Sequence, residues 1–263
     1  MTSSKSLLSL TNRLRDAGIP LPELEARWLL KYSFSSELES NVARRVRHEP
    51  LAKILGSKGF YKYEFKTTAD TLDPRDDSEA LLSLAFQRFP DKAASLKVAD
   101  ICSGTGCLGL SFAAEYPAVV LTMVDVSAKA MAVARDNAAA MGLTVRTSFF
   151  TGDMDVFQEN GFHLLFFNPP YLRTSELLAL DADTAYDPVI ALDGGEDGLT
   201  FYRRFNAAWL AADGCLIAEI GAEQRDAVVA IMRDKGLFLA SEKKDLGGVV
   251  RALLFTANRL SGG

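Results

Sequence analysis

The first 70 residues of the chain carry apolar side chains at the three- and four-residue spacing of amphipathic helices. Helices are predicted at 7–17, where glycine and proline follow, at 22–30, where proline can begin a helix, and at 36–48. Residues 61–66 then alternate between aromatic and charged side chains, which predicts a short hairpin strand. The pattern therefore predicts a small helical N-terminal domain over residues 1–70, with a hairpin linker at its end.

From residue 71 onward the period changes, and short apolar runs alternate with amphipathic segments. This order is typical of a doubly wound α/β domain, in which helices cover both faces of a parallel sheet. We expect such a domain over residues 71–263, with a final antiparallel pair that completes a seven-stranded, mostly parallel sheet. The predicted strands are 97–101, 119–125, 145–150, 162–167, 215–220, 238–242 and 251–256, and the predicted helices are 80–89, 106–116, 128–141, 199–210 and 223–235.

The strand at 162–167 is an uninterrupted apolar run that stops at Asn168-Pro169-Pro170-Tyr171. Because proline has no amide hydrogen and a fixed φ, the double proline ends the strand and turns the chain stiffly out of the sheet. Ligands of open α/β sheets bind beyond the carboxyl ends of the strands. The motif therefore holds an amide and an aromatic ring where a ligand would lie, although these four residues alone fit a simple stiffened turn equally well.

A glycine-rich loop, Cys102–Gly106, follows Asp100 and connects the first strand to its helix. Glycines allow close backbone approach to a ligand, and a helix N-terminus offers free amides. With Gly109 the stretch also spells the G-x-G-x-x-G pattern of dinucleotide sites, so a nicotinamide-dependent oxidoreductase is an alternative. Asp100 favours a different ligand, because a carboxylate in this loop repels a pyrophosphate and attracts a sulfonium or ammonium group. S-adenosylmethionine is such a cation. Asp125, at the end of the second strand, is placed to accept from a ribose diol, which suits either cofactor.

A loop beside the glycine loop would place Asn168 next to the methyl group of that cofactor. The carboxamide oxygen of Asn168 and the carbonyl of Pro169 can accept the two hydrogens of a planar NH2 group. Holding both favours a pyramidal, more nucleophilic nitrogen whose lone pair is directed at the methyl carbon, and Tyr171 can stack on the planar acceptor. Positioning then supplies much of the rate enhancement. The predicted chemistry is methyl transfer to an amide or amino nitrogen.

Composition restricts the class of protein without changing this interpretation. The 263 residues are 48% hydrophobic and 24% charged, which are ordinary globular values. The net charge of −5 disfavours a broad polyanion-binding surface, so stable binding to nucleic acid is not expected. The sequence has neither an apolar run of membrane-spanning length nor a signal-peptide pattern. The 3 cysteines lack paired CxxC spacing, so we predict no disulfide framework, no metal site and a cytoplasmic location.

A basic cluster on the third predicted helix contains Arg44, Arg45, Arg47 and His48. Charge runs of this kind usually form a solvated helix face. The functional alternative is a docking surface for an acidic or RNA-associated partner.

These motifs resemble those of the protein-(glutamine-N5) methyltransferases of the HemK/PrmC family, along nearly the whole chain. The resemblance rests on the residues at 74–79, 168–171, 186–202 and 219–221, which include the run Asp-Gly-Gly-Glu-Asp-Gly. It implies a class I, Rossmann-like methyltransferase that uses S-adenosylmethionine. The implied substrate is the glutamine amide of the Gly-Gly-Gln motif in peptide-chain release factors. In that family the N-terminal domain helps to hold the release factor, which would give the basic cluster a role.

The sequence departs from the family pattern at Cys102, where the family has glycine, and at Asp76, where it has proline. A methyltransferase-like binding subunit without activity is a non-enzymatic alternative, which the intact Asn-Pro-Pro-Tyr motif disfavours. Two nearer alternatives are a ribosomal-protein glutamine methylase and a nucleic-acid amino-group methylase. We expect a monomeric enzyme whose partner is a release factor.

The predicted site residues form three groups. Those expected to act on the amide are Asn168, Pro169, Pro170 and Tyr171. Those expected to bind the cofactor are Asp100, Cys102, Ser103, Gly104, Thr105, Gly106, Asp125, Val126, Asp153, Met154 and Asn168. Those expected on the substrate side are Arg75 and Glu79, together with the four residues of the Asn-Pro-Pro-Tyr motif.

Overall fold

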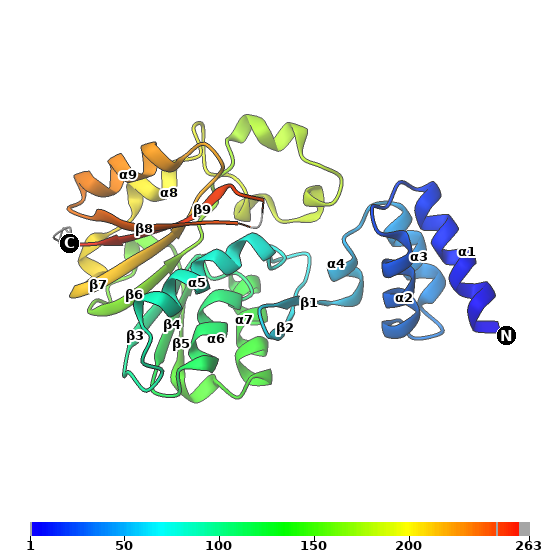
Figure 1. The fold of residues 1–263 in the computed structure, drawn as a ribbon, viewed down its shortest axis with the longest axis horizontal. Helices are drawn as coiled ribbons and strands as arrows, with labels where there is room; N and C mark the ends of the chain where they lie inside the picture. Colours follow the sequence, from blue (N-terminus) through cyan, green and yellow to red (C-terminus); the bar gives the residue numbers. More distant parts are fainter. Residues whose placement is uncertain (1, 246, 258–263) are drawn as a thin grey trace.

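The computed structural model describes residues 2–245 and 247–257, and its centre is a seven-stranded sheet (Figure 1). The strands are β3 (Lys97–Ile101), β4 (Val120–Asp125), β5 (Thr147–Thr151), β6 (Phe162–Phe167), β7 (Leu210–Glu219), β8 (Phe238–Lys244) and β9 (Val250–Thr256). Their order across the sheet is β5-β4-β3-β6-β7-β9-β8. All neighbours pair in parallel except β9, which is antiparallel to both β7 and β8. The predicted doubly wound sheet and its final antiparallel pair are confirmed.

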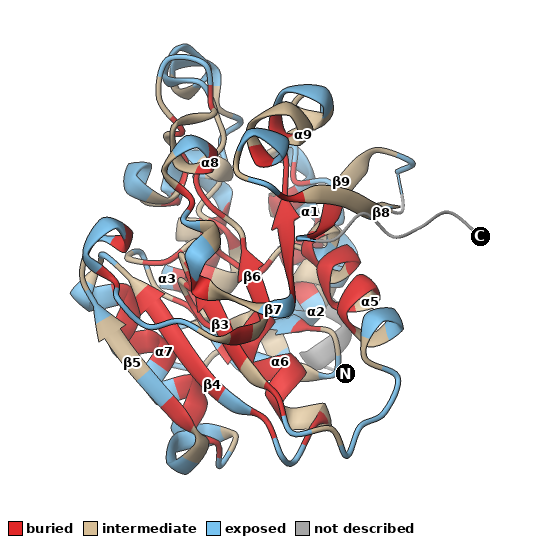
Figure 2. Cartoon of the chain, turned by 90° about the vertical axis from the view of Figure 1, so that its left-hand side faces the viewer, coloured by how far each residue is buried: buried red, intermediate tan, exposed pale blue. Residues whose placement is uncertain are grey.

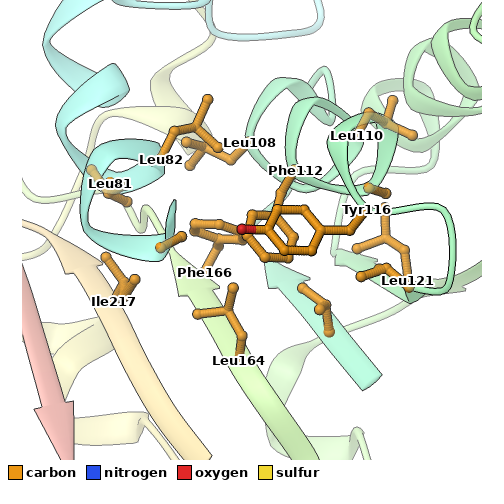
Figure 3. Packing of buried hydrophobic residues seen from close by; sticks show 14 of the residues in the cluster. Leu81, Leu82, Leu108, Leu110, Phe112, Tyr116, Leu121, Leu164, Phe166 and Ile217 are labelled. Carbon is orange, nitrogen blue, oxygen red and sulfur yellow. The ribbon is translucent and has the colours of Figure 1, made fainter. Parts of the chain in front are cut away.

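Helices cover both faces of this sheet. One face packs against α5 (Glu79–Arg88), α6 (Cys107–Glu115) and α7 (Ala128–Ala140), and the other against α8 (Thr200–Arg204) and α9 (Arg225–Asp234). Figure 3 shows the first face, where Phe112 and Tyr116 stack with ring centroids 4.2 Å apart beside Phe166. Because both faces are covered, central strands such as β6 are near-continuous apolar runs, and Figure 2 shows the central strands largely buried.

Four helices and a hairpin precede α5 and the sheet. They are α1 (Thr2–Asp16), α2 (Pro22–Tyr32), α3 (Leu38–Val46), α4 (Leu51–Leu55), β1 (Ser57–Phe60) and β2 (Tyr63–Lys66), and α1 to α3 lie at one end of the molecule in Figure 1. Leu14, Leu29 and Val42 are fully buried in a small core of their own. The three predicted helices and the hairpin are present, whereas α4 was not predicted because it is too short to show a period. Throughout the described residues, each helix is too short or too polar to cross a membrane.

The hairpin is attached to the sheet domain through Asn137 of α7. Its side-chain oxygen accepts from the backbone N–H of Lys66 at 2.7 Å, and its side-chain nitrogen donates to the carbonyls of Lys66 and Thr105 at 3.1 and 2.9 Å. This buried amide therefore ties the end of the hairpin to the loop that follows β3.

The helix predicted at 199–210 is wrong in its second half. Helix α8 ends at Arg204, and the side chain of Asn206 accepts from the backbone of the next turn at 3.0 Å, which starts a 3-10 turn. Trp209, in that turn, is buried in the second core, and β7 begins at Leu210. A short polar side chain that bonds its own backbone thus interrupts a pattern whose apolar spacing favours a continuous helix.

Candidate active site

A pocket opens at the carboxyl ends of β3, β4 and β6. Parallel α/β sheets present their ligand sites at this edge. The loop after β3 and the start of the Asn-Pro-Pro-Tyr motif both line it. The two motifs meet because β3 and β6 are neighbours in the sheet, with Ile101 paired to Phe167 at their ends.

The loop after β3 is held by two aspartates. The carboxylate of Asp125 accepts from the backbone N–H groups of Gly104 and Ser127, both at 2.8 Å. Asp100 is buried, and its Oδ2 accepts from the backbone N–H of Gly109 at 2.9 Å. Gly104 has a φ of 54°, a conformation that glycine adopts without strain. The aspartates thereby fix the curvature of the loop around the pocket.

These aspartates also place two carboxyl groups at the pocket, both with raised pKa values. Burial raises the pKa of Asp100 to about 8, against the bond from Gly109, and the charge on Asp125 raises it further. Burial likewise raises the pKa of Asp125. Within the described residues neither carboxylate has an ion-pair partner, so a cationic ligand would stabilise both in their ionised form.

The Asn-Pro-Pro-Tyr motif is joined to a buried carboxylate beneath the pocket. Nδ2 of Asn168 lies 3.5 Å from the Oγ of Ser78. The Ser78 hydroxyl donates to Oε2 of Glu219 at 2.5 Å, and the Tyr171 hydroxyl donates to Oε1 of the same carboxylate at 3.3 Å. Glu219 is 2% exposed, and this burial raises its pKa to about 7. Both polar side chains of the motif therefore connect to Glu219, directly or through Ser78.

The segment between Tyr171 and α8 runs back along this motif. Leu172 forms a parallel bridge with Asp193, and the backbone N–H of Gly194 donates to the carbonyl of Leu172 at 2.7 Å. A Cβ on Gly194 would lie 2.8 Å from both the carbonyl oxygen of Pro170 and the Cα of Tyr171. Glycine is required there because the two backbones approach too closely for a side chain.

A buried ion cluster joins the N-terminal helices to the wall of the pocket. Nζ of Lys53, in α4, lies 2.8 Å from Oδ1 of Asp73 and 3.0 Å from Oδ1 of Asp187. Arg75 also pairs with Asp187. Because Asp73 and Arg75 line the pocket, the cluster fixes this wall against both α4 and the segment that carries Asp187.

Most of the predicted site residues meet in the pocket. Glu79 does not line it, because its carboxylate accepts from the backbone N–H of Tyr61 at 2.8 Å and so holds the β1–β2 turn. Cys102 has a φ of 62°, the left-handed region that favours the glycine of the family pattern. The roles of these residues in binding and catalysis stay predictions. Among the predicted site residues, Gly106, Pro169 and Tyr171 also do not line the pocket. The predicted site residues that do line it are Arg75, Asp100, Cys102, Ser103, Gly104, Thr105, Asp125, Val126, Asp153, Met154, Asn168 and Pro170.

Sequence reasoning assigned no site role to Ser78, Glu219 or Arg204. Ser78 and Arg204 line the pocket, and Arg204 pairs with Asp153 at the end of β5. The available signal for Glu219 was a lone carboxylate at the end of an apolar strand, a position at which charged residues are rarely buried.

The interpretation of the basic cluster as a solvated face or a docking surface is wrong for Arg45. Its side chain is 2% exposed and pairs with Glu25 at 2.5 Å and Asp183 at 3.1 Å. Arg44 pairs with Glu49 at 2.5 Å. A buried guanidinium is retained when its charge is paired, and Arg45 uses this pairing to attach α3 to the segment around Asp183.

Comparisons with solved structures identify the fold of the sheet domain. The hMettl16 catalytic domain, solved in complex with MAT2A 3'UTR hairpin 1, has a TM-score of 0.60 at 13% identity and covers 84% of this chain and 82% of its own. The ribosomal protein L11 methylase from Lactobacillus delbrueckii subsp. bulgaricus has a TM-score of 0.51 at 17% identity, with 76% and 91% covered. A family model described as the Methyltransferase small domain matches residues 73–182. The sheet domain therefore has the fold of class I methyltransferases.

Curated relatives define the family within this class. Proteins from Rhodospirillum rubrum and Caulobacter vibrioides are 34% and 32% identical to this chain; they cover 92% and 99% of it, and 81% and 98% of their own length is matched. A protein from Moorella thermoacetica is 34% identical, with 90% of this chain and 92% of its own covered. All three are named release factor glutamine methyltransferase. The chain belongs to the family of release factor glutamine methyltransferases, which confirms the resemblance seen in its motifs.

Proposed function

We propose that the protein transfers the methyl group of S-adenosylmethionine to the glutamine side-chain amide of the Gly-Gly-Gln motif in a peptide-chain release factor. The observation that carries this proposal is the position of Asn168, which lines the same pocket as Asp100 and Asp125. Membership of the family supports the substrate, because the relatives are named for glutamine methylation of release factors.

The residues of the pocket fit a cationic nucleoside cofactor. Asp100 would balance its positive charge, and Asp125 with the loop at Gly104 would hold its sugar. The Oγ of Ser103 is buried and has no hydrogen-bond partner among the described residues, so the pocket retains a polar group for a ligand. When bound, the cofactor supplies an electrophilic methyl group.

The protein's part in the reaction is to orient the substrate amide. The carboxamide oxygen of Asn168 and the carbonyl of Pro169 would accept the two hydrogens of the NH2 group. With both hydrogens held, the nitrogen lone pair is directed into the pocket, and the reacting atoms lose little further freedom in the transition state. The nitrogen loses its extra proton after the transfer, so no strong base has to act before it.

A methyl-transfer assay tests the proposal directly. Purified protein and labelled S-adenosylmethionine are incubated in parallel with a release factor, with ribosomes and with RNA. We expect label on the release-factor glutamine. Label on RNA or on a ribosomal protein, with none on the release factor, would show that the substrate assignment is wrong. Binding of NADH without binding of S-adenosylmethionine would overturn the cofactor assignment.

A variant of Asn168 separates orientation of the amide from cofactor binding. Asn168→Ala is expected to lower turnover at least about a hundredfold while calorimetry still detects binding of S-adenosylmethionine. Asn160→Ala, at an exposed asparagine, is the matched control and should leave both unchanged. If Asn168→Ala loses cofactor affinity in proportion to turnover, Asn168 is a cofactor ligand instead.

A further inference from the structure

Glu219 is a buried carboxylate that lies behind the pocket wall and accepts two hydrogen bonds. It ends β7, is 2% exposed, and receives the hydroxyls of Ser78 and Tyr171 on its two oxygens. Ser78 lines the pocket while Glu219 does not. Burying a carboxylate costs free energy of folding unless hydrogen bonds or a paired charge compensate for the lost water.

The single hydrogen of the Ser78 hydroxyl determines what Ser78 offers to Asn168. An ionised carboxylate can only accept, so Ser78 directs its hydrogen to Glu219 and presents lone pairs on its other side. The neighbouring group on that side is the Asn168 carboxamide, 3.5 Å away. Because the two ends of a carboxamide differ, the NH2 end makes a weak attraction with Ser78, whereas the oxygen end would set two acceptors against each other. Ser78 therefore selects the orientation with Nδ2 toward itself.

We propose that Glu219, acting through Ser78, is a positioning residue that fixes the Asn168 carboxamide with its Oδ1 free to accept from the substrate amide. The proposal rests on the proposed function for the identity of that amide, whereas the orientation itself follows from the hydrogen-bond geometry. Tyr171 donates to the other oxygen of Glu219. One carboxylate thereby fixes both polar side chains of the Asn-Pro-Pro-Tyr motif.

Protonation of Glu219 would release this arrangement. A protonated carboxyl has a hydrogen of its own to donate, so the Ser78 hydroxyl becomes free to turn toward Asn168 and favour the reversed amide. Burial raises the pKa of Glu219 to about 7, against the hydrogen bonds from Ser78 and Tyr171. The charge of Arg251 lowers this pKa and that of Asp77 raises it. The proposal therefore predicts that kcat falls as the pH drops through about 7.

The first test is kinetic and is made at saturating cofactor and substrate. Ser78→Ala should lower kcat about tenfold or more, with a small change in the dissociation constant of S-adenosylmethionine, and Ser78→Thr, which keeps the hydroxyl, should restore most of it. Glu219→Gln should remove the acidic limb of the kcat profile. Ser111→Ala is the matched control, because Ser111 is also buried but its Oγ has no partner among the described residues. Equal kcat values for Ser78→Ala and Ser78→Thr, or a loss explained entirely by cofactor affinity, would overturn the proposal.

The second test needs no substrate, so it separates this proposal from the proposed function. Asparagine-selective 15N labelling gives side-chain NH2 signals, and the pair that disappears in Asn168→Ala belongs to Asn168. That pair should titrate with a midpoint near pH 7 in the wild type and lose the titration in both Ser78→Ala and Glu219→Gln. An Asn168 signal that does not respond to pH or to Ser78→Ala contradicts the positioning role even in an active enzyme. A signal that titrates in a protein unable to methylate a release factor supports the positioning role and refutes the substrate assignment.

Discussion

Replacing Lys53 with methionine tests how much the buried ion cluster contributes to stability. Methionine keeps an unbranched apolar stem and removes the charge. The side chains of Lys53, Asp73 and Asp187 are 3%, 5% and 1% exposed, so the change leaves two buried carboxylates, of which Asp187 still pairs with Arg75. Removing one partner of a buried ion pair costs about 3–5 kcal/mol, because the other charge is left without compensation. We expect Lys53→Met to lower the free energy of unfolding by that amount.

Lys129 provides a control with the same chemistry and a different environment. Its Nζ lies 3.0 Å from Oδ1 of Asp70, but the two side chains are 76% and 42% exposed. An exposed pair contributes about 0–1 kcal/mol, since water and salt screen it. Burial alone should therefore separate Lys53→Met from Lys129→Met by about 2–5 kcal/mol.

Urea unfolding measures this difference, with fluorescence of Trp28 and Trp209 reporting on the N-terminal helices and the sheet domain. Equal denaturant slopes allow the midpoint shift to be converted into free energy. Adding Asp73→Asn to Lys53→Met removes one of the uncompensated charges and should restore part of the loss. The reasoning is refuted if Lys53→Met is no less stable than Lys129→Met, because the cluster would then be hydrated or neutral in the folded protein.

Two further predictions concern the pocket. Gly194→Ala should displace the backbone at Pro170 and Tyr171, and so lower stability by about 1–3 kcal/mol and also lower turnover. The control is Gly59→Ala, where a Cβ meets nothing within 4 Å; unfolding and activity assays should show no change in its stability or turnover. The pKa of Asp100, raised by burial from 3.8 to about 8, means that between these values the folded protein holds a proton that the unfolded chain has lost. Stability should therefore fall as the pH rises toward 8, by at most about 1.4 kcal/mol per pH unit. Asp100→Asn should remove this contribution, and identical profiles of stability against pH for the wild type and Asp100→Asn would contradict the prediction.

Local pattern was enough to predict the elements that frame the pocket. The strands expected at 97–101 and 162–167 have the bounds of β3 and β6. A glycine-rich loop follows the first strand, and Asn168 with two prolines follows the second. Sheet order then followed from the general behaviour of doubly wound folds, which place the first and fourth parallel strands side by side. The meeting of the glycine loop with Asn168 was therefore predictable before any contact was seen.

The polar groups that hold the pocket together were not predictable in the same way. Ser78 and Glu219 are 141 residues apart, and Arg75 and Asp187 are 112 residues apart. No periodicity encodes such a pair, since each residue alone is compatible with a solvent-exposed position. Arg45 shows the same limit: its sequence neighbours indicate a basic surface, and a distant aspartate makes it a buried connector.

The third glycine of the G-x-G-x-x-G pattern has a different structural role here from its role in a dinucleotide site. In such a site the third glycine allows the helix to pack closely on the strand, and first-turn amides face the pyrophosphate. Gly109 lies in the first turn of α6, but its N–H donates to Asp100, and a Cβ there would lie 2.9 Å from the Cβ of Asp100. The glycine therefore makes room for a buried carboxylate and occupies one of the amides that an anion would need. The same spacing that fits a phosphate in one class of protein here accommodates a buried carboxylate, and this contact disfavours the oxidoreductase alternative.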